Sequence, residues 1–277
     1  MTAERVWFIT GTASGFGRAL ADAVLERGEW VVASARRPEQ LSDLAEHDRV
    51  VVLALDVTSP EQRTAAVRQA IERLGRIDVL VNNAGRTQVG AVEETTEAEL
   101  RDLFELHFFA PAALTRAVLA HMRARGSGTI VQMSSVGGQV TAPGFGAYCA
   151  TKFALEGLTE TLRDEVAPFG IHTLIVEPGP FRTGLFRAGA AYESAAMPEY
   201  VDTVGPTRAY VRGNHGLQPG DPAKAAAAII AAVDAEDPPL RLVLGEEAIG
   251  NVRERLAAMA DELGRWEALG RATAIEE

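Results

Sequence analysis

The sequence has little cysteine and little positive charge, and each shortage excludes a class of protein. Its one cysteine, Cys149, cannot form an intrachain disulfide, which suits a reducing cytoplasm. The formal net charge is −11, whereas proteins that bind nucleic acid or an anionic membrane surface usually present a basic face. We therefore expect neither nucleic acid nor membrane as a partner, and a cytoplasmic location.

Long apolar runs and metal-ligand clusters are also missing from the sequence. The alanine-rich run Ala225–Val233 is too short to span a bilayer. A strand-like run already begins at Val6, which leaves no room for a signal peptide. The histidines and the cysteine are scattered, without the spacing of a metal site. The sequence thus predicts a soluble protein without a bound metal.

What the chain does have is ample apolar residue content for one large core. Its 277 residues are 47% hydrophobic and 23% charged, ordinary values for a globular protein. We expect residues 1–277 to form a single domain.

Short apolar runs alternate with longer segments of helical period along most of the chain. This alternation predicts an α/β fold with a doubly wound parallel sheet, Rossmann-type, and helices on both faces. The expected strands are Val6–Thr10, Trp30–Ala35, Val50–Leu55, Val79–Val81, Thr129–Ser134, His172–Glu177 and Arg241–Leu244. The expected helices are Gly17–Arg27, Glu61–Leu74, Glu97–Arg125, Tyr148–Phe169 and Pro222–Ala235.

Two segments depart from the alternation. Residues 180–219 contain glycine, proline and scattered aromatics without a clear period, and a long irregular insert of this kind is often a substrate lid. Residues 245–277 form a charged helical tail with an apolar stripe that packs on its own domain or on a partner subunit. The stripe consists of Ile249, Val252, Leu256, Met259 and Leu263.

A glycine-rich turn joins the first predicted strand to the first predicted helix. Gly11, Gly15 and Gly17, with Ser14 and Phe16 between them, let the backbone turn tightly at the start of the helix. Free N–H groups and the helix dipole favour phosphate there. A glycine triplet alone can be a bare turn, but a strand before it and a helix after it predict a dinucleotide site.

The end of the second strand favours NADP(H) over NAD(H). NAD-preferring sites place an acidic residue there for the ribose 2′-hydroxyl. Here that position is Ala35, and Arg36 and Arg37 follow, so a guanidinium can face a 2′-phosphate. The alternative is that the two arginines are merely a solvated turn.

Three residues form a candidate catalytic set. Tyr148 and Lys152 are four apart in a helical pattern and share a face. A phenol has a pKa near 10, and we expect the neighbouring ammonium to lower it toward neutrality. Ser135 ends a predicted strand, and its hydroxyl could donate to a substrate oxygen. Tyr-x-x-x-Lys alone is weak and also occurs in ordinary surface helices.

As a set, these motifs make the sequence resemble the short-chain dehydrogenase/reductase family, and within it, loosely, the hydroxysteroid/retinol-type branch. The matching pieces, in family order over roughly residues 5–185, are Thr10–Gly17, Asp56-Val57, Asn82–Gly85, Ser135, Tyr148, Lys152, Pro178-Gly179 and Thr183.

The resemblance implies a role for each of these residues. Asp56, followed by Val57, would bind the adenine amino group, and Asn83, Ala84 and Gly85 would support the sheet and the adenosine ribose. Lys152 would also bind the nicotinamide ribose. Pro178, Gly179 and Thr183 would seat the nicotinamide amide, and Arg36 occupies the family's NADP-selective basic position. Taken singly, Asp56 could simply start a turn, and the other pieces are common turn sequences.

One position departs from the family pattern. His107 stands where the family usually has an asparagine that holds a water linked to the lysine. We expect His107 to complete a proton relay with Ser135, Tyr148 and Lys152, because its unperturbed pKa is near 6.5. The alternative is a packed, neutral core histidine.

The predicted function is therefore that of an NADP(H)-dependent ketoreductase or dehydrogenase acting on a small-molecule carbonyl or alcohol. Apolar residues near Val136–Phe145 and in the 180–219 segment favour a medium-sized apolar substrate. Two other classes stay open: an epimerase or dehydratase of the same fold, and an NADP-binding redox sensor. The resemblance also implies a homodimer or homotetramer formed through the helices that carry His107 and Tyr148.

Overall fold

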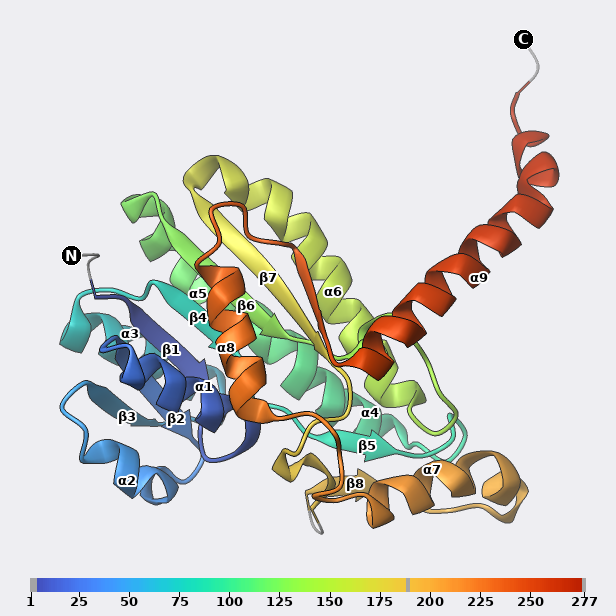
Figure 1. Cartoon of the computed structure of the whole chain (residues 1–277), viewed down its shortest axis with the longest axis horizontal. Helices are drawn as coiled ribbons and strands as arrows, with labels where there is room; N and C mark the ends of the chain where they lie inside the picture. Colours follow the sequence, from blue (N-terminus) through green and yellow to red (C-terminus); the bar gives the residue numbers. More distant parts are fainter. Residues whose placement is uncertain (1–3, 188–189, 276–277) are drawn as a thin grey trace.

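The protein is built on one seven-stranded parallel sheet (Figure 1). The computed structural model describes residues 4–187 and 190–275. The sheet has the order β3-β2-β1-β4-β6-β7-β9. This confirms the predicted fold class, and the seven expected strands agree with the structure to within one residue at each end. The strands are β1 (Val6–Thr10), β2 (Trp30–Ala35), β3 (Val50–Ala54), β4 (Val79–Asn82), β6 (Gly128–Met133), β7 (Ile171–Pro178) and β9 (Arg241–Leu244).

The strand order reverses beside β1, which pairs with β2 on one side and β4 on the other. Connections from β1 and β4 therefore leave in opposite directions, and sheets of this kind bind ligands at such a switch point, outside the carboxyl ends of the strands. The glycine turn follows β1, and Asn82 ends β4. The topology thus brings the phosphate-binding and catalytic motifs to one edge of the sheet.

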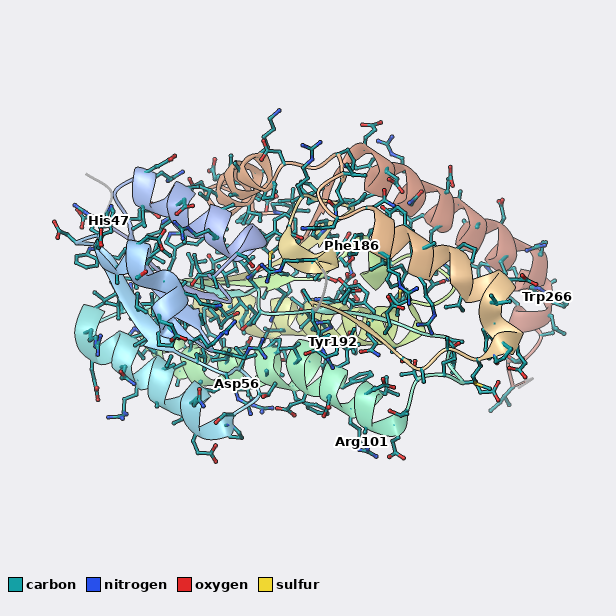
Figure 2. The ribbon with its side chains drawn as sticks, turned by 90° about the horizontal axis from the view of Figure 1, so that it is seen from below. His47, Asp56, Arg101, Phe186, Tyr192 and Trp266 are labelled. Carbon is teal, nitrogen blue, oxygen red and sulfur yellow. The ribbon has the colours of Figure 1, made fainter. Side chains whose placement is uncertain are left out.

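Helices cover both faces of the sheet, as the two views show (Figures 1 and 2). On one face α1 (Gly15–Glu26) and α8 (Pro222–Val233) enclose a core with Leu20 and Ile229. On the other face lies a second core made by α3 (Pro60–Leu74), α5 (Ala110–Arg125) and α6 (Gly146–Val166). Strands buried on both faces explain why they read as continuous apolar runs.

The helix expected over Glu97–Arg125 is continuous but not uniform. It comprises α4 (Glu97–Phe104), a π-helical turn over Glu105–Phe109 and then α5. By length and composition alone this run, unlike Ala225–Val233, is apolar enough to cross a membrane. Leu114, Val118 and Met122, however, are buried in the second core against the sheet. The run therefore serves as a core helix of this fold.

The segment expected to be irregular contains more regular structure than its sequence indicates. Strand β8 (Ala191–Glu193) pairs in parallel with β5 (Thr87–Val89), and α7 extends over Val201–Gly213. Helix α7 lacks a clear apolar period because it has Gly205 and Pro206 inside it and buries only Val204, Arg208 and Val211. Positions 188–189 of the predicted 180–219 lid lie outside the described residues. The short helix α2 (Ser42–Ala45) was likewise not expected.

The carboxyl-terminal helix α9 (Glu246–Arg271) starts at the end of β9 and runs away from the rest of the molecule (Figure 1). Only its first residues pack on the chain: Ala248 and Val252 are buried. From Arg253 onward every described residue is exposed. The ends of the predicted tail and domain, positions 276–277 and 1–3, are outside the described range.

Candidate active site

The glycine turn after β1 is held in place by the segment that follows β4. The Asn83 side chain donates to the carbonyls of Thr10 and Gly11, at 2.7 and 3.2 Å. The backbone N–H groups of Asn83 and Ala84 donate to the Thr10 hydroxyl. The Asn83 side-chain amide thus ties the segment after β4 directly to the glycine turn, which is consistent with the supporting role predicted for it.

The turn also requires its glycines. Gly11 and Gly15 have φ of 71° and 61°, in the left-handed region that L side chains rarely adopt. A Cβ on Gly17 would lie 2.4 Å from the Asn83 amide nitrogen and 2.5 Å from the Gly11 carbonyl oxygen. Larger residues at these positions would push the turn and the start of α1 apart.

Helix α1 begins at this turn with its first N–H groups free of side-chain caps. Ser14, the N-cap residue, makes no side-chain capping bond. Across the turn, a Cβ on Gly15 would lie 3.1 Å from the Thr183 Cβ. Phe16 packs against Phe181, with ring centroids 5.1 Å apart. The turn and the segment after β7 therefore face each other.

That segment begins with the predicted Pro178-Gly179 pair. Pro178 ends β7, and the Gly179 N–H donates to the Leu244 carbonyl at 2.9 Å. A Cβ on Gly179 would lie 3.0 Å from the Cβ of Ala248, so the start of α9 packs directly on this turn. Thr183 then caps a short 3-10 turn by accepting from the Leu185 N–H.

The end of β2 presents two solvated cations. Ala35 is buried at the last strand position, and Arg36 and Arg37 after it are exposed. Neither arginine forms an ion pair with any described residue. The charge of Arg36 nevertheless reaches Asp56, where it contributes to lowering the pKa of that carboxyl. The guanidinium groups remain available for an anion at this edge.

Asp56 follows β3 at the same edge. Burial favours its protonated form, but bonds from the Thr58 hydroxyl and N–H outweigh burial, so the pKa of Asp56 is below its ordinary value. These bonds also form the simple turn that we considered as the alternative. Val57 is buried in the second core, and its carbonyl accepts from Arg63. Val57 therefore offers no free side chain to a ligand.

Tyr148, Ser135 and Lys152 converge at the carboxyl end of β6. A Cβ on Gly137 would lie 3.2 Å from the Tyr148 ring and 3.4 Å from the Ser135 hydroxyl. The two side chains therefore both lie next to Gly137. The Lys152 ammonium lies 5.7 Å from the Tyr148 ring centroid and donates to the Met133 carbonyl at 2.8 Å. The predicted set is thus brought together by α6 and the turn after β6.

The pKa of Tyr148 differs from the expectation. Burial of the phenol raises its pKa to about 12, although a hydrogen bond with Ser135 opposes the rise. Burial also lowers the pKa of Lys152 to about 8, while the charge of Glu156 opposes this shift. In the chain alone, then, burial outweighs the hydrogen bond with Ser135, and the phenol keeps its proton at neutral pH.

His107 lies in the π-helical turn and is buried. Its Nε2 accepts from the Arg86 backbone N–H at 3.2 Å, so the ring proton resides on Nδ1, which faces the Thr151 hydroxyl at 2.9 Å. That hydroxyl donates to the Tyr148 carbonyl. Burial, with the charges of Lys152 and Arg86, holds the pKa of His107 well below its ordinary value.

Both ring nitrogens of His107 are thus occupied within the chain. Its ring also meets the Tyr148 ring edge to face, with centroids 5.6 Å apart. This geometry favours the packed, neutral histidine that we left open as the alternative to a relay. His107 contacts the ring and, through Thr151, the backbone of Tyr148.

Behind the candidate catalytic residues lies a buried charged group that sequence reasoning missed. Glu156 accepts from the Ser134 hydroxyl and pairs with Arg241, which also contacts Glu177 at 2.9 Å. Burial and the charge of Glu156 raise the pKa of Glu177 to about 7, against the opposing charge of Arg241. The spacing of Glu156, four residues after Lys152, was the available signal.

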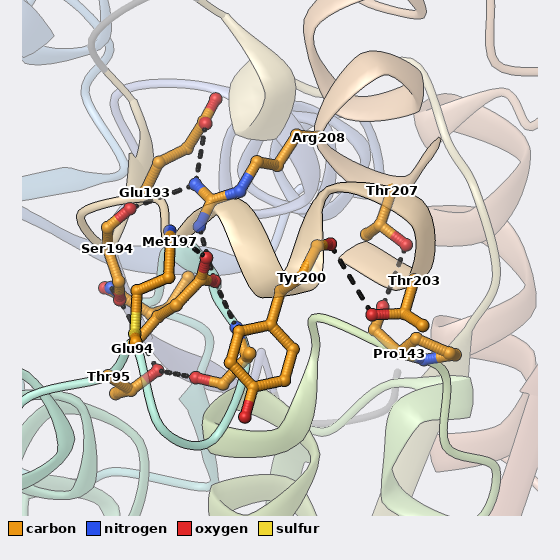
Figure 3. A network of polar contacts seen from close by, with 12 residues as sticks. Glu94, Thr95, Pro143, Glu193, Ser194, Met197, Tyr200, Thr203, Thr207 and Arg208 are labelled. Carbon is orange, nitrogen blue, oxygen red and sulfur yellow. Dashed lines mark hydrogen bonds and ion pairs between the residues drawn. The ribbon is translucent and has the colours of Figure 1, made fainter. Parts of the chain in front are cut away.

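A second missed network ties the predicted lid to the body of the protein (Figure 3). Arg208 of α7 donates to Glu94 at 2.7 Å, to Glu193 at 3.1 Å and to the Ser194 carbonyl at 3.0 Å. Glu94 is buried and also accepts from the Met197 N–H. The lid is therefore anchored by charge, which an apolar pattern cannot reveal.

Fold and site together define a Rossmann-type protein of the nicotinamide-dependent oxidoreductase class. The chain belongs to the short chain dehydrogenase family, whose model matches residues 5–193.

Two solved structures and one curated relative show how far the similarity extends. A short-chain dehydrogenase from Streptomyces avermitilis is 56% identical, with a TM-score of 0.93 over 99% of this chain and 100% of that one. Oxidoreductase BOA17 from Botryotinia fuckeliana is 38% identical over 98% of this chain and 99% of its own. A short chain dehydrogenase from Burkholderia cenocepacia in complex with NADP is 27% identical, with a TM-score of 0.71 over 99% and 100% of the two chains.

Proposed function

We propose that the chain is an NADP(H)-dependent oxidoreductase that interconverts a ketone or aldehyde and the corresponding alcohol on a medium-sized apolar substrate. Tyr148 serves as the general acid and base. The observation that carries the proposal is the convergence of Tyr148, Ser135 and Lys152 on the sheet edge that also holds the glycine turn.

The residues at that edge fit the dinucleotide. The absence of a Cβ at Gly15 and Gly17 lets the turn close tightly against Thr183 and Asn83, and free N–H groups at the start of α1 suit a pyrophosphate. Arg36 and Arg37 would hold a 2′-phosphate, and the missing acid at Ala35 removes the repulsion that an NAD-type site would impose. Asp56 keeps its charge for the adenine amino group.

The bound nicotinamide would donate or accept the hydride. The chain itself supplies the proton and its position. In the reductive direction the protonated phenol of Tyr148 donates to the substrate oxygen, which suits its high pKa in the chain alone. Ser135 stabilises the charge that develops on that oxygen. Lys152, with a pKa of about 8, carries a positive charge at neutral pH that favours the developing phenolate.

The substrate side of the site is lined by apolar rings, which supports an apolar carbonyl compound. The Phe145 and Tyr148 ring centroids are 6.2 Å apart, and those of Phe186 and Tyr210 are 5.9 Å apart. Phe145, Phe186 and Val204 belong to a third apolar cluster between the lid and the body. The presence of Tyr148 and Lys152 with an intact glycine turn favours an enzyme over a sensor.

The test is a panel of apolar ketones and alcohols assayed with both cofactors, on the parent and on Arg36→Ala. We expect NADPH-dependent reduction, and we expect Arg36→Ala to raise the KM for NADPH at least tenfold while NADH changes little. Arg68→Ala, which removes an exposed arginine on α3, is the control. Equal losses for both cofactors would contradict the phosphate assignment, and no turnover of any carbonyl would contradict the proposed reaction.

A further inference from the structure

A regular apolar stripe runs along α9, and beyond the buried Val252 it is exposed. Its members follow each other at alternating spacings of three and four residues, which is the a/d pattern of a coiled coil. They are Ile249, Val252, Leu256, Met259, Leu263 and Trp266. The last four are exposed by 55%, 49%, 72% and 63%. Trp266 lies near the far end of the helix, well away from the sheet (Figure 2).

Such a helix is not expected to stand alone. At 1.5 Å per residue α9 is about 39 Å long, and from Arg253 onward all of its described residues are exposed. Most helical stability in proteins comes from packing an apolar face, and this part of α9 has none buried among the described residues. Several exposed apolar side chains in one row also exceed what a solvated helix needs.

We propose that the α9 helices of two copies of this chain pair antiparallel along this stripe. The stripe is symmetric about its midpoint, between Ala257 and Ala258. Antiparallel pairing therefore matches every layer with a member of the same stripe: Leu256 faces Met259 of the partner subunit, Val252 faces Leu263 of the partner subunit, and Ile249 faces Trp266 of the partner subunit.

The flanking charges select this orientation. Arg255 and Glu262 occupy the same flank of the stripe, one heptad apart. Antiparallel pairing brings Arg255 beside Glu262 of the partner subunit, and the symmetric contact repeats this pair. Parallel pairing would instead place Glu262 beside Glu267 of the partner subunit, which repels. A second copy of the chain is thus complementary to α9 in shape and in charge.

The pairing would also place each helix tip near the other subunit's site. The base of α9 packs on Gly179 through Ala248, and the charge of Glu247 reaches Tyr210 of the lid helix α7. Ile249 is half-buried at that base, and Trp266 of the partner subunit would cover it. This surface is separate from α5 and α6, the helices through which the family resemblance implies dimerisation.

The test is the mass of the full chain in solution, measured by sedimentation equilibrium. We expect Leu256→Asp and Leu263→Asp each to halve the mass of the assembly, because a charge in the stripe breaks the pairing. Ala257→Asp places the same charge on the outer face and should keep the parent mass. If the Leu variants keep the parent mass, α9 does not join two copies.

Charge reversal tests the orientation. Arg255→Glu and Glu262→Arg alone each place like charges opposite one another, and each should raise the dissociation constant by roughly tenfold. Mixing the two variants restores both opposite-charge pairs, so the mixture should associate as tightly as the parent. If the mixture associates no better than either variant alone, the antiparallel register is wrong. Neither substitution touches the proposed catalytic site, so ketone reduction by the separated subunits reports independently on the proposed function.

Discussion

At the scale of single residues, the geometry around Tyr148 separates groups that exchange protons from groups that hold them in place. Burial raises the pKa of Tyr148 to about 12 and lowers that of Lys152 to about 8, so near neutral pH both carry a proton. A neutral phenol has a proton to donate but is a poor base. The chain by itself therefore holds the proton that the proposed carbonyl reduction would use.

We interpret His107 as a positioning residue in this arrangement, because both of its ring nitrogens are hydrogen-bonded within the chain. We expect His107→Ala to lower the kcat for ketone reduction about tenfold, because the Tyr148 ring loses its edge-to-face contact. Affinity for NADPH should stay near that of the parent. The shape of the pH–rate profile should also be unchanged, because a neutral histidine contributes no titration. Thr151→Val, which removes the hydroxyl facing His107, should produce a smaller loss of the same kind.

The discriminating result is the pH–rate profile of His107→Ala. A shift of its acidic or basic limb relative to the parent would show that His107 exchanges protons. That outcome would support the proton relay through His107 and contradict the positioning role.

Much of the candidate site follows from residue type and spacing alone. Tyr148 and Lys152, four apart on a helix, and three glycines between a strand and a helix can each be identified without coordinates. The pKa of Tyr148 could not, because burial and charge oppose one another and only the fold decides which is larger. The bonds of His107 were equally hidden, since Arg86 and Thr151 lie far from it in sequence.

At the scale of elements, the lid depends on one buried arginine. Arg208 joins α7 to Glu94 and Glu193, and its side chain is 9% exposed. We expect Arg208→Met to cost about 3 kcal/mol of stability, because it leaves Glu94 buried without its cation. We also expect the substrate KM to rise several-fold while the KM for NADPH changes little. Substrate kinetics and chemical denaturation measure the two effects.

Arg212→Met is the matched control. Arg212 pairs with the same Glu193, but its side chain is 67% exposed, and exposed pairs contribute little. We expect no measurable loss of stability and unchanged kinetics. If Arg208→Met is as mild as Arg212→Met, the buried network does not hold the lid.

The sequence predicts best those elements that are buried on both faces, because most of their residues are then apolar. The strands of the central sheet are buried on both faces, so continuous apolar runs identify them. Helix α7 and strand β8 are held by Arg208, Glu94 and a short partner strand, contacts that join distant parts of the chain. No local period records such contacts, so the sequence alone predicts an irregular insert there.

At the scale of the whole molecule, the candidate active site at the sheet edge and the proposed pairing surface on α9 are separate parts of the structure. The sheet gathers the glycine turn, Arg36 and Tyr148 at one edge, because parallel strands end together. Helix α9 leaves that edge and presents an apolar stripe to solvent. The sequence shows the stripe, but only the structure shows that no described residue buries it beyond Val252. Association of two copies through α9 would cover this stripe and place the tip of each α9 near the site of the partner subunit.

The most direct test of the central claim is the rate of ketone reduction by Tyr148→Phe, with NADPH binding measured on the same protein. The substitution removes the hydroxyl and keeps the ring against His107 and Phe145. We predict a fall in kcat of at least about a thousandfold with NADPH affinity near that of the parent. A Tyr148→Phe protein that reduces the ketone at the parent's rate would contradict the account.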